Sequence, residues 1–312
     1  MATPLLQVSD LSVAFRQGAN VTLAVDRVSF SIAQGETLAI VGESGSGKSV
    51  SALSIPRLLN YPAAFHPSGT ILFDGRDTLR MEEAQLRDLR GNDITMVFQE
   101  PMTSLNPLYT VGHQVSEAIA LHQGLPKRRA MVKAVEMLRR VSIPEPEQRA
   151  HSFPHQLSGG MRQRVMIAMA LSCNPKVLIA DEPTTALDVT IQAQILELMR
   201  ELQQAYGMAV VLITHDMGVV AENADRVVVM YAGRKVEEAD VEALCERPAH
   251  PYTRGLLQSI PHLDEAGKAG PRLRLNEIKG MVPSLAHLPA GCSFAPRCSQ
   301  ASDRCRASAP PL

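Results

Sequence analysis

Eight consecutive residues carry the clearest chemical signal in this sequence. They follow the pattern G-x-x-x-x-G-K-[ST] and read Gly42, Glu43, Ser44, Gly45, Ser46, Gly47, Lys48 and Ser49. Glycines in such a loop let backbone N–H groups surround phosphates, and the N-terminus of a following helix adds a positive dipole. We therefore predict a phosphate-binding loop in which Lys48 contacts the β- and γ-phosphates and the Ser49 hydroxyl binds Mg²⁺.

A pair of carboxylates, Asp181 and Glu182, ends the apolar run at residues 177–181. Asp181 suits an outer contact to Mg²⁺, and Glu182 is placed to orient or deprotonate a water molecule. On its own, an apolar run that ends in Asp-Glu is usually a strand entering a solvated turn. The phosphate-binding loop earlier in the chain is what favours a catalytic pair.

A second anion site is predicted where Ser158-Gly159-Gly160 leads into an amphipathic helical pattern. The N-terminus of that helix would attract a phosphate. The alternative is a plain helix cap, because serine is a preferred N-cap residue. Since two phosphate sites of one chain do not easily reach one nucleotide, the economical interpretation is that this site serves the nucleotide of a partner.

Short apolar runs supply the strands that must position these residues. They are too uniformly apolar for half-exposed strands and are typical of a parallel sheet covered by helices; they lie at 37–42, 94–99, 177–181 and 209–215. Helical patterns separate them, at Lys48–Leu59, Lys127–Val141, Arg162–Ser172 and Ile191–Tyr206. Alternating segments predict paired antiparallel strands at Leu5–Phe15 and Val21–Ile32. The predicted fold class is α/β with a central parallel sheet.

The chain is predicted to divide near Pro261, where glycine and proline become frequent and apolar periodicity fades. Residues 1–260 would form one large domain with a mostly helical insertion at about 90–170, and 261–312 a small loop-rich tail. A β-hairpin is expected after Asp225, turning at Gly233, followed by a short helix at Val241–Glu246.

Composition excludes several classes of function. The 312 residues include 31 Lys and Arg and 32 Asp and Glu, a formal net charge of −1, which argues against a general nucleic-acid binder. Aromatic residues make up only 4%, with no Trp, which argues against a stacking platform for single-stranded nucleic acid. No apolar run reaches the roughly 18 residues of a membrane span. The N-terminus lacks the pattern of a signal peptide, so the chain is expected to stay on the side where it is made.

Together these motifs resemble the ATP-binding subunits of ABC transporters over almost the whole chain. The phosphate-binding loop, the segment LSGGMRQR at 157–164 and VLIADE at 177–182 stand in the order of that superfamily, as do Ala186-Leu187-Asp188 and His215 of ITHD. The resemblance implies an ABC-type P-loop nucleotide-binding domain. Its expected parts are a parallel-sheet core, an antiparallel β subdomain, a helical signature subdomain and the loop-rich C-terminal tail.

The resemblance also implies roles for single residues. The catalytic set would be Glu182, His215, Gln99 and Lys48. Mg²⁺ would be held by Ser49, Gln99 and Asp181, and the adenine of ATP would stack on Phe15. The nucleotide of the partner would contact Ser158, Gly159, Gly160 and Gln163, and Asp188 would lie in the D-loop of the family.

Two further segments resemble importers of the dipeptide, oligopeptide and nickel group: residues 99–107 and 250–254. The chain looks most like the glutathione- and dipeptide-import ATPases, and is expected to hydrolyse ATP to drive uptake of short peptides. The alternatives are an importer of nickel or another small solute, and a soluble ABC ATPase with no role in transport. In this family a short cytoplasmic permease helix is received near residues 99–111, with apolar anchors at Met102, Leu105, Leu108 and Tyr109.

The partners implied by the resemblance are other proteins and not nucleic acid. A second cassette is required, because one set of motifs is present: a copy of this chain, a paralogue or a fused half. Two transmembrane permeases, and through them a substrate-binding protein, complete the assembly. The chain would lie peripherally on the cytoplasmic face of the bacterial inner membrane.

Three cysteines crowd the C-terminal end, at Cys292, Cys298 and Cys305. Thiolates at close spacing suggest a metal, either an iron–sulfur cluster or zinc. The peptide-importer family carries a similar set with a fourth cysteine slightly further on, and some members are thought to hold a 4Fe–4S cluster there. This sequence reaches Leu312 without that fourth cysteine. Unpaired reduced thiols are the alternative.

Overall fold

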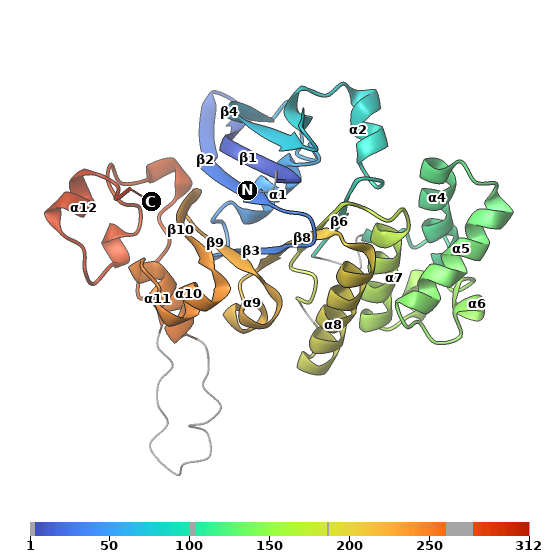
Figure 1. Cartoon of the computed structure of the whole chain (residues 1–312). Coiled ribbons are helices and arrows are strands. Elements are labelled where there is room, and N and C mark those ends of the chain that lie inside the picture. The colour runs from blue at the N-terminus through green and yellow to red at the C-terminus, as the bar shows by residue number, and fades with distance from the viewer. Residues whose placement is uncertain (1–3, 100–103, 186, 260–276, 312) are drawn as a thin grey trace, which may run out of the picture.

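The computed structural model describes residues 4–99, 104–185, 187–259 and 277–311. Two sheets occupy the middle of the molecule, a helical lobe lies on one side and the C-terminal region on the other (Figure 1). This is the architecture expected of the ABC-type cassette. Among the described residues, no helix is long and apolar enough to cross a membrane.

The larger sheet has the strand order β10-β9-β3-β8-β7-β6. Its strands are β3 (Thr37–Val41), β6 (Ile94–Val97), β7 (Val177–Asp181), β8 (Ala209–Thr214), β9 (Arg226–Tyr231) and β10 (Arg234–Asp240). Neighbouring strands are parallel except β9 and β10, which form the expected hairpin. Every residue of β3, β7 and β8 is buried, which explains their uniformly apolar sequences.

The smaller sheet is antiparallel, with the order β2-β1-β4-β5. Its strands are β1 (Leu6–Gln17), β2 (Asn20–Ile32), β4 (Ala64–Phe73) and β5 (Arg76–Asp77). The pairing of β1 with β2 was expected, whereas β4 was not predicted. Leu6 and Ile32 of this sheet share an apolar core with Leu38 and Ile40 of β3, so the two sheets pack together.

Helices cover the larger sheet and build the lobe. They are α1 (Lys48–Ser54), α2 (Glu83–Leu89), α4 (Val111–Gln123), α5 (Lys127–Arg140), α6 (Pro146–Arg149), α7 (Gly159–Leu171), α8 (Val189–Tyr206), α9 (Met217–Asn223), α10 (Val241–Glu246), α11 (Pro251–Gln258) and α12 (Asp303–Ala307). Single 3₁₀ turns lie at Thr78–Arg80, Pro154–Gln156, Leu285–His287 and Ala295–Arg297.

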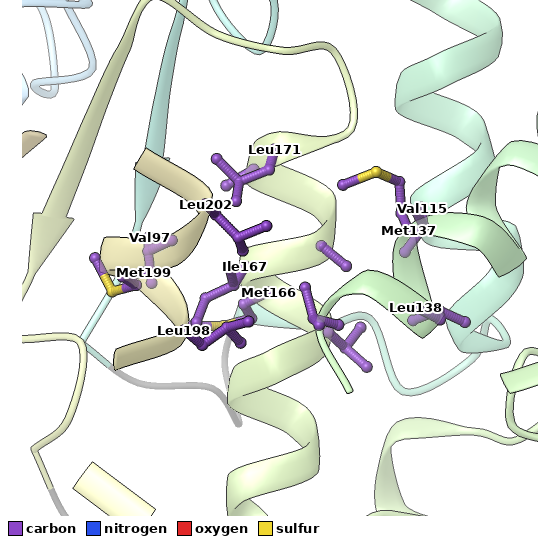
Figure 2. Packing of buried hydrophobic residues seen from close by; sticks show 14 of the residues in the cluster. Val97, Val115, Met137, Leu138, Met166, Ile167, Leu171, Leu198, Met199 and Leu202 are labelled. Carbon is purple, nitrogen blue, oxygen red and sulfur yellow. The ribbon is translucent and has the colours of Figure 1, made fainter. Parts of the chain in front are cut away.

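The helical lobe is joined to the sheet by one continuous core. Val115 of α4 and Met137 of α5 pack toward α7, and Ile167 of α7 packs toward Leu198 of α8 (Figure 2). Val97 of β6 belongs to the same core. Movement of α7 is therefore mechanically linked to the strands that carry the candidate catalytic residues.

The C-terminal region packs beside β9 and β10 (Figure 1). Tyr231, which ends β9, contacts the ring of Tyr252 of α11 at 4.7 Å between centroids and that of Phe294 at 5.2 Å. Cys292 and Cys298 pack against this same aromatic group. Residues 277–311 thus obtain an apolar core by sharing that of the cassette.

Candidate active site

The phosphate-binding loop joins the end of β3 to the start of α1, as the sequence predicts. Gly42 has a φ of +150°, and a Cβ there would lie 2.1 Å from the Met230 carbonyl oxygen. Gly47 has a φ of +97°, and its Cβ would lie 3.0 Å from the Ala24 carbonyl oxygen. Because the loop is pressed against β2 and β9, these two positions require glycine.

The ammonium group of Lys48 is held inside the loop. Lys48 is 5% exposed, and its Nζ donates to the carbonyl oxygens of Gly42 at 2.7 Å and Glu43 at 3.1 Å. Burial lowers the pKa of Lys48, while the carboxylates of Glu182, Asp181 and Glu43 oppose that shift. A compact cation in a loop of backbone N–H groups is suited to bind phosphate.

The predicted magnesium ligands Ser49 and Asp181 lie together. Ser49 Oγ donates to Asp181 Oδ1 at 3.0 Å, which joins the start of α1 to the end of β7. Burial raises the pKa of Asp181, and the hydrogen bond from Ser49 opposes that effect. A hydroxyl and a carboxylate are oxygen ligands of the kind Mg²⁺ prefers, so these residues fit the ion. A bound cation would favour the ionised form of the buried carboxyl group.

Glu182 is the centre of a small polar cluster. Its Oε2 accepts hydrogen bonds from Gln99 Nε2 at 3.0 Å and Thr185 Oγ1 at 2.9 Å. Its Oε1 lies 3.3 Å from His215 Nδ1. The structure thus brings together the predicted residues from the ends of β6, β7 and β8. The contact of Thr185 with Glu182 was not predicted from the sequence. The spacing of three residues within a turn is compatible with a hydrogen bond between the two side chains.

These residues line one open cleft of about 1090 Å³. It includes the whole phosphate-binding loop together with Gln99, Glu182, Thr185 and His215. Part of the cleft wall comes from the C-terminal side of the chain, through Leu256, Ser259, Glu277, Ile278 and Leu285. Sequence reasoning did not find this wall, because no local pattern links it to a loop more than 200 residues earlier.

The predicted partner-facing residues lie outside this cleft. Ser158 is exposed and caps α7, with its Oγ accepting from the Met161 N–H at 3.3 Å, and Gly159 beside it is exposed as well. Gln163 is 1% exposed within α7. Asp188 caps α8 by accepting from the Ile191 N–H at 2.9 Å. Both caps are contacts between a side chain and the start of its own helix, so they do not test a contact with a partner, and the roles of these residues toward a partner remain predictions. Ala186 lies outside the described residues.

Phe15 lies on β1, half-buried, and packs against the core between the two sheets. It does not line the cleft around the phosphate-binding loop. Adenine stacking on Phe15 therefore remains a prediction.

The predicted permease-facing segment is only partly described, and Met102 lies outside the described residues. Leu108 is 80% exposed and Tyr109 is 48% exposed. Leu105 is 2% exposed and belongs to the core of the helical lobe, so the expectation that it is a surface anchor was wrong. Leu105 was expected to contact a permease because it is apolar and lies within a family motif, but its side chain packs under the turn that precedes α4.

The three cysteines do not form a metal site. They are free thiols, and Cys305 Sγ lies 3.3 Å from Ser302 Oγ. Within the described parts of the chain, no group of three or more His, Cys, Asp or Glu side chains is arranged to hold a metal ion. The arrangement of the described residues therefore gives no support to an iron–sulfur cluster or a zinc ion at these cysteines.

Comparison with known proteins decides the family. The sequence model described as "ABC transporter" matches residues 25–185. The chain belongs to the ABC transporter family. As an ABC ATPase it binds ATP with Mg²⁺ and hydrolyses ATP. A second model, described as "Oligopeptide/dipeptide transporter, C-terminal region", matches residues 236–305.

Relatives of this ABC protein match along nearly their full length. The dipeptide transport ATP-binding protein DppD of Escherichia coli is 53% identical, over 99% of this chain and 92% of the relative. The oligopeptide transport ATP-binding protein AppD of Bacillus subtilis is 52% identical over the same shares. A solved structure described as the dimeric structure of MJ0796, a bacterial ABC transporter cassette, has a TM-score of 0.67 and 30% identity, over 76% of this chain and 98% of that chain.

Proposed function

We propose that this chain is the ATP-hydrolysing subunit of a membrane importer for short peptides, such as dipeptides, oligopeptides or glutathione. The observation that carries the proposal is the joint presence of an ABC cassette at 25–185 and the peptide-transporter C-terminal region at 236–305. Relatives named for dipeptide and oligopeptide transport cover both parts. The proposal divides the chain into an ATP-binding domain at 1–260, with its helical subdomain at about 90–170, and a C-terminal region at 261–312, whereas the match to the peptide-transporter region begins earlier, at residue 236.

In this proposal the polar cluster around Glu182 performs the hydrolysis. Glu182 accepts a proton from the attacking water, since its carboxylate faces the cleft that holds the phosphate-binding loop. His215 and Gln99, each in contact with Glu182, orient the water and the γ-phosphate. Lys48 balances the charge of the phosphates. Ser49, Asp181 and Gln99 would hold Mg²⁺, which would supply further positive charge to the phosphates.

We propose that the exposed start of α7 contacts a second cassette and that the exposed residues Leu108 and Tyr109 contact the permeases. A second cassette supplies the capped helix start at Ser158, Gly159 and Gly160 to the nucleotide of the first, with Gln163 behind it and Asp188 nearby. The dimeric description of the similar solved cassette supports this pairing. Two permeases receive the movement at Leu108 and Tyr109, and a substrate-binding protein acts through them. The subunit then lies on the cytoplasmic face of the bacterial inner membrane.

Uptake of labelled di- and tripeptides tests the function. A strain that lacks this gene should lose uptake, and the intact gene should restore it. A gene encoding Glu182→Gln provides the matched control, because that protein should fold and assemble without turnover. Normal peptide uptake in the deleted strain, in the absence of a second peptide importer, would contradict the peptide assignment and leave the ATPase assignment intact.

A further inference from the structure

Glu43, the second residue of the phosphate-binding loop, is held by two residues from the C-terminal side of the chain. The backbone N–H of Glu43 donates to the Tyr252 hydroxyl at 2.8 Å. Its carboxylate accepts two hydrogen bonds from Arg297, Nη1 to Oε2 at 2.6 Å and Nη2 to Oε1 at 3.0 Å. This is the parallel, two-bond geometry that makes arginine–carboxylate pairs strong and well oriented.

Arg297 has no unused donor. Besides the two bonds to Glu43, its Nε donates to the Lys279 carbonyl oxygen at 3.1 Å, Nη2 to the Ile278 carbonyl oxygen at 2.9 Å and Nη1 to the Tyr231 hydroxyl at 3.4 Å. These contacts use all five N–H groups of a guanidinium. The Arg297 side chain is 4% exposed and that of Glu43 is 29% exposed, so solvent reaches the pair mainly from the Glu43 side.

The aromatic group described above holds both partners of Glu43 in place. Tyr252 is fully buried, and its ring contacts those of Tyr231 and Phe294. The guanidinium carbon of Arg297 lies 5.8 Å from the ring centroid of Tyr231 and 6.0 Å from that of Phe294. The C-terminal region and the phosphate-binding loop are therefore joined through one connected set of contacts.

The negative charge of Glu43 links its contact with Arg297 to the binding of ATP. Lys48 Nζ donates to the Glu43 carbonyl oxygen at 3.1 Å, and both residues line the same cleft, so Glu43 lies close to the place where phosphates would bind. An unpaired carboxylate at this place would repel a triphosphate. Arg297 offsets that repulsion, and Tyr252 holds the loop backbone at Glu43; both effects favour nucleotide binding.

We propose that Arg297 and Tyr252 are positioning residues for ATP, and that docking of residues 277–311 onto the cassette sets its nucleotide affinity through Glu43. By linkage, bound nucleotide must in turn strengthen the docking of the C-terminal region. This gives the peptide-transporter C-terminal region a role inside the nucleotide site itself, separate from any contact with a permease.

The test is a double-mutant cycle on the full chain, read out as binding of a fluorescent ATP analogue and as KM and kcat for MgATP. Arg297→Gln should weaken nucleotide binding about tenfold and raise KM likewise, with kcat changed less than about twofold. Glu43→Gln combined with Arg297→Gln should recover most of the lost affinity, because the repelling charge is gone. Arg297→Lys should lie between wild type and Arg297→Gln.

Arg306→Gln is the matched control, since Arg306 lies in the same region, is 65% exposed and pairs with Asp303 instead. It should bind nucleotide as the wild type does. A folded Arg297→Gln protein with unchanged affinity, or a double variant as weak as the single one, would overturn the proposal. Should Arg297→Gln not fold, Tyr252→Phe removes only the hydroxyl that accepts from Glu43. A loss of affinity of a few fold would support the proposal, and unchanged affinity would refute it.

Discussion

The carboxylate of Glu182 and the imidazole of His215 are 3.3 Å apart, at the ends of the adjacent strands β7 and β8. The Glu182 side chain is 17% exposed, whereas that of His215 is 63% exposed. The carboxylate thus anchors one ring nitrogen while the rest of the ring faces the cleft. A group anchored on one side and open on the other is suited to contact the γ-phosphate without reorganising.

Replacing Glu182 by Gln should abolish ATP turnover and leave nucleotide binding intact. The amide keeps the shape of the side chain and its contact with Thr185, but it does not accept the proton of the attacking water. Steady-state hydrolysis and binding of a fluorescent ATP analogue check the two halves separately. Hydrolysis at the wild-type rate would show that Glu182 is not the base.

His215→Ala should slow hydrolysis by roughly 10²–10³, the usual effect of losing one polar contact to a transition state. Binding of ATP should change far less, because Lys48 and the loop backbone remain. His151→Ala, at an exposed position of the helical lobe, serves as the control and should hydrolyse normally. A rate within threefold of wild type for His215→Ala would remove His215 from the mechanism.

Dimerisation should depend on ATP. The Glu182→Gln protein should elute as a larger species with ATP than with ADP, alone or mixed with its partner cassette. Ser158→Arg in that background should prevent the change, because it places bulk and charge at the exposed start of α7. If ATP and ADP give the same oligomeric state in every combination, the shared nucleotide site is refuted.

A charge at Leu108 should uncouple transport from hydrolysis. Leu108 is 80% exposed beside the helical lobe, so Leu108→Asp leaves the core intact while disturbing an apolar contact with a permease. Peptide uptake should fall, and the ATPase activity of the isolated subunit should remain at the wild-type level. Leu121→Asp, at a 75% exposed position of α4, should affect neither. Unchanged uptake with Leu108→Asp would exclude this surface.

Protein purified without oxygen should be colourless and contain neither iron nor zinc in stoichiometric amount. Although the backbone N–H of Cys292 donates to the Cys305 carbonyl oxygen at 2.8 Å, the side chains of the described residues do not form a group of three that could hold a metal ion, and the expectation follows from that. Elemental analysis of wild type and Cys298→Ser measures it. One metal centre per chain, lost in Cys298→Ser, would show that the thiols rearrange to bind metal.

Local patterns predicted the elements that carry the candidate site residues, because the loop, the strand ends and the helix caps each depend on a few adjacent residues; the roles of those residues remain predictions. The strand β4 was missed since it contains Pro67 and Gly69 and is defined by its pairing with β1 across irregular register, for instance Ser12 with Ser68. Helix α1 ends at Ser54 and not at the predicted Leu59, because Pro56 lacks the N–H that would continue it. The contact between Glu43 and Arg297 spans 254 residues, so only the folded chain reveals it.

The position of β3 between β8 and β9 also fixes when the ATP site can form during synthesis. Thr37 pairs with Val210 of β8, and Leu38 pairs with Arg226 of β9, so β3 has no neighbour in its sheet until the ribosome has made β8, and it gains its second neighbour only with β9. The strands β1, β2 and β4 are complete by Phe73 and can pair much earlier. The nascent chain therefore carries β3 as an unpaired, mostly apolar segment while the helical lobe is translated, and exposed apolar strands of this kind are prone to aggregation.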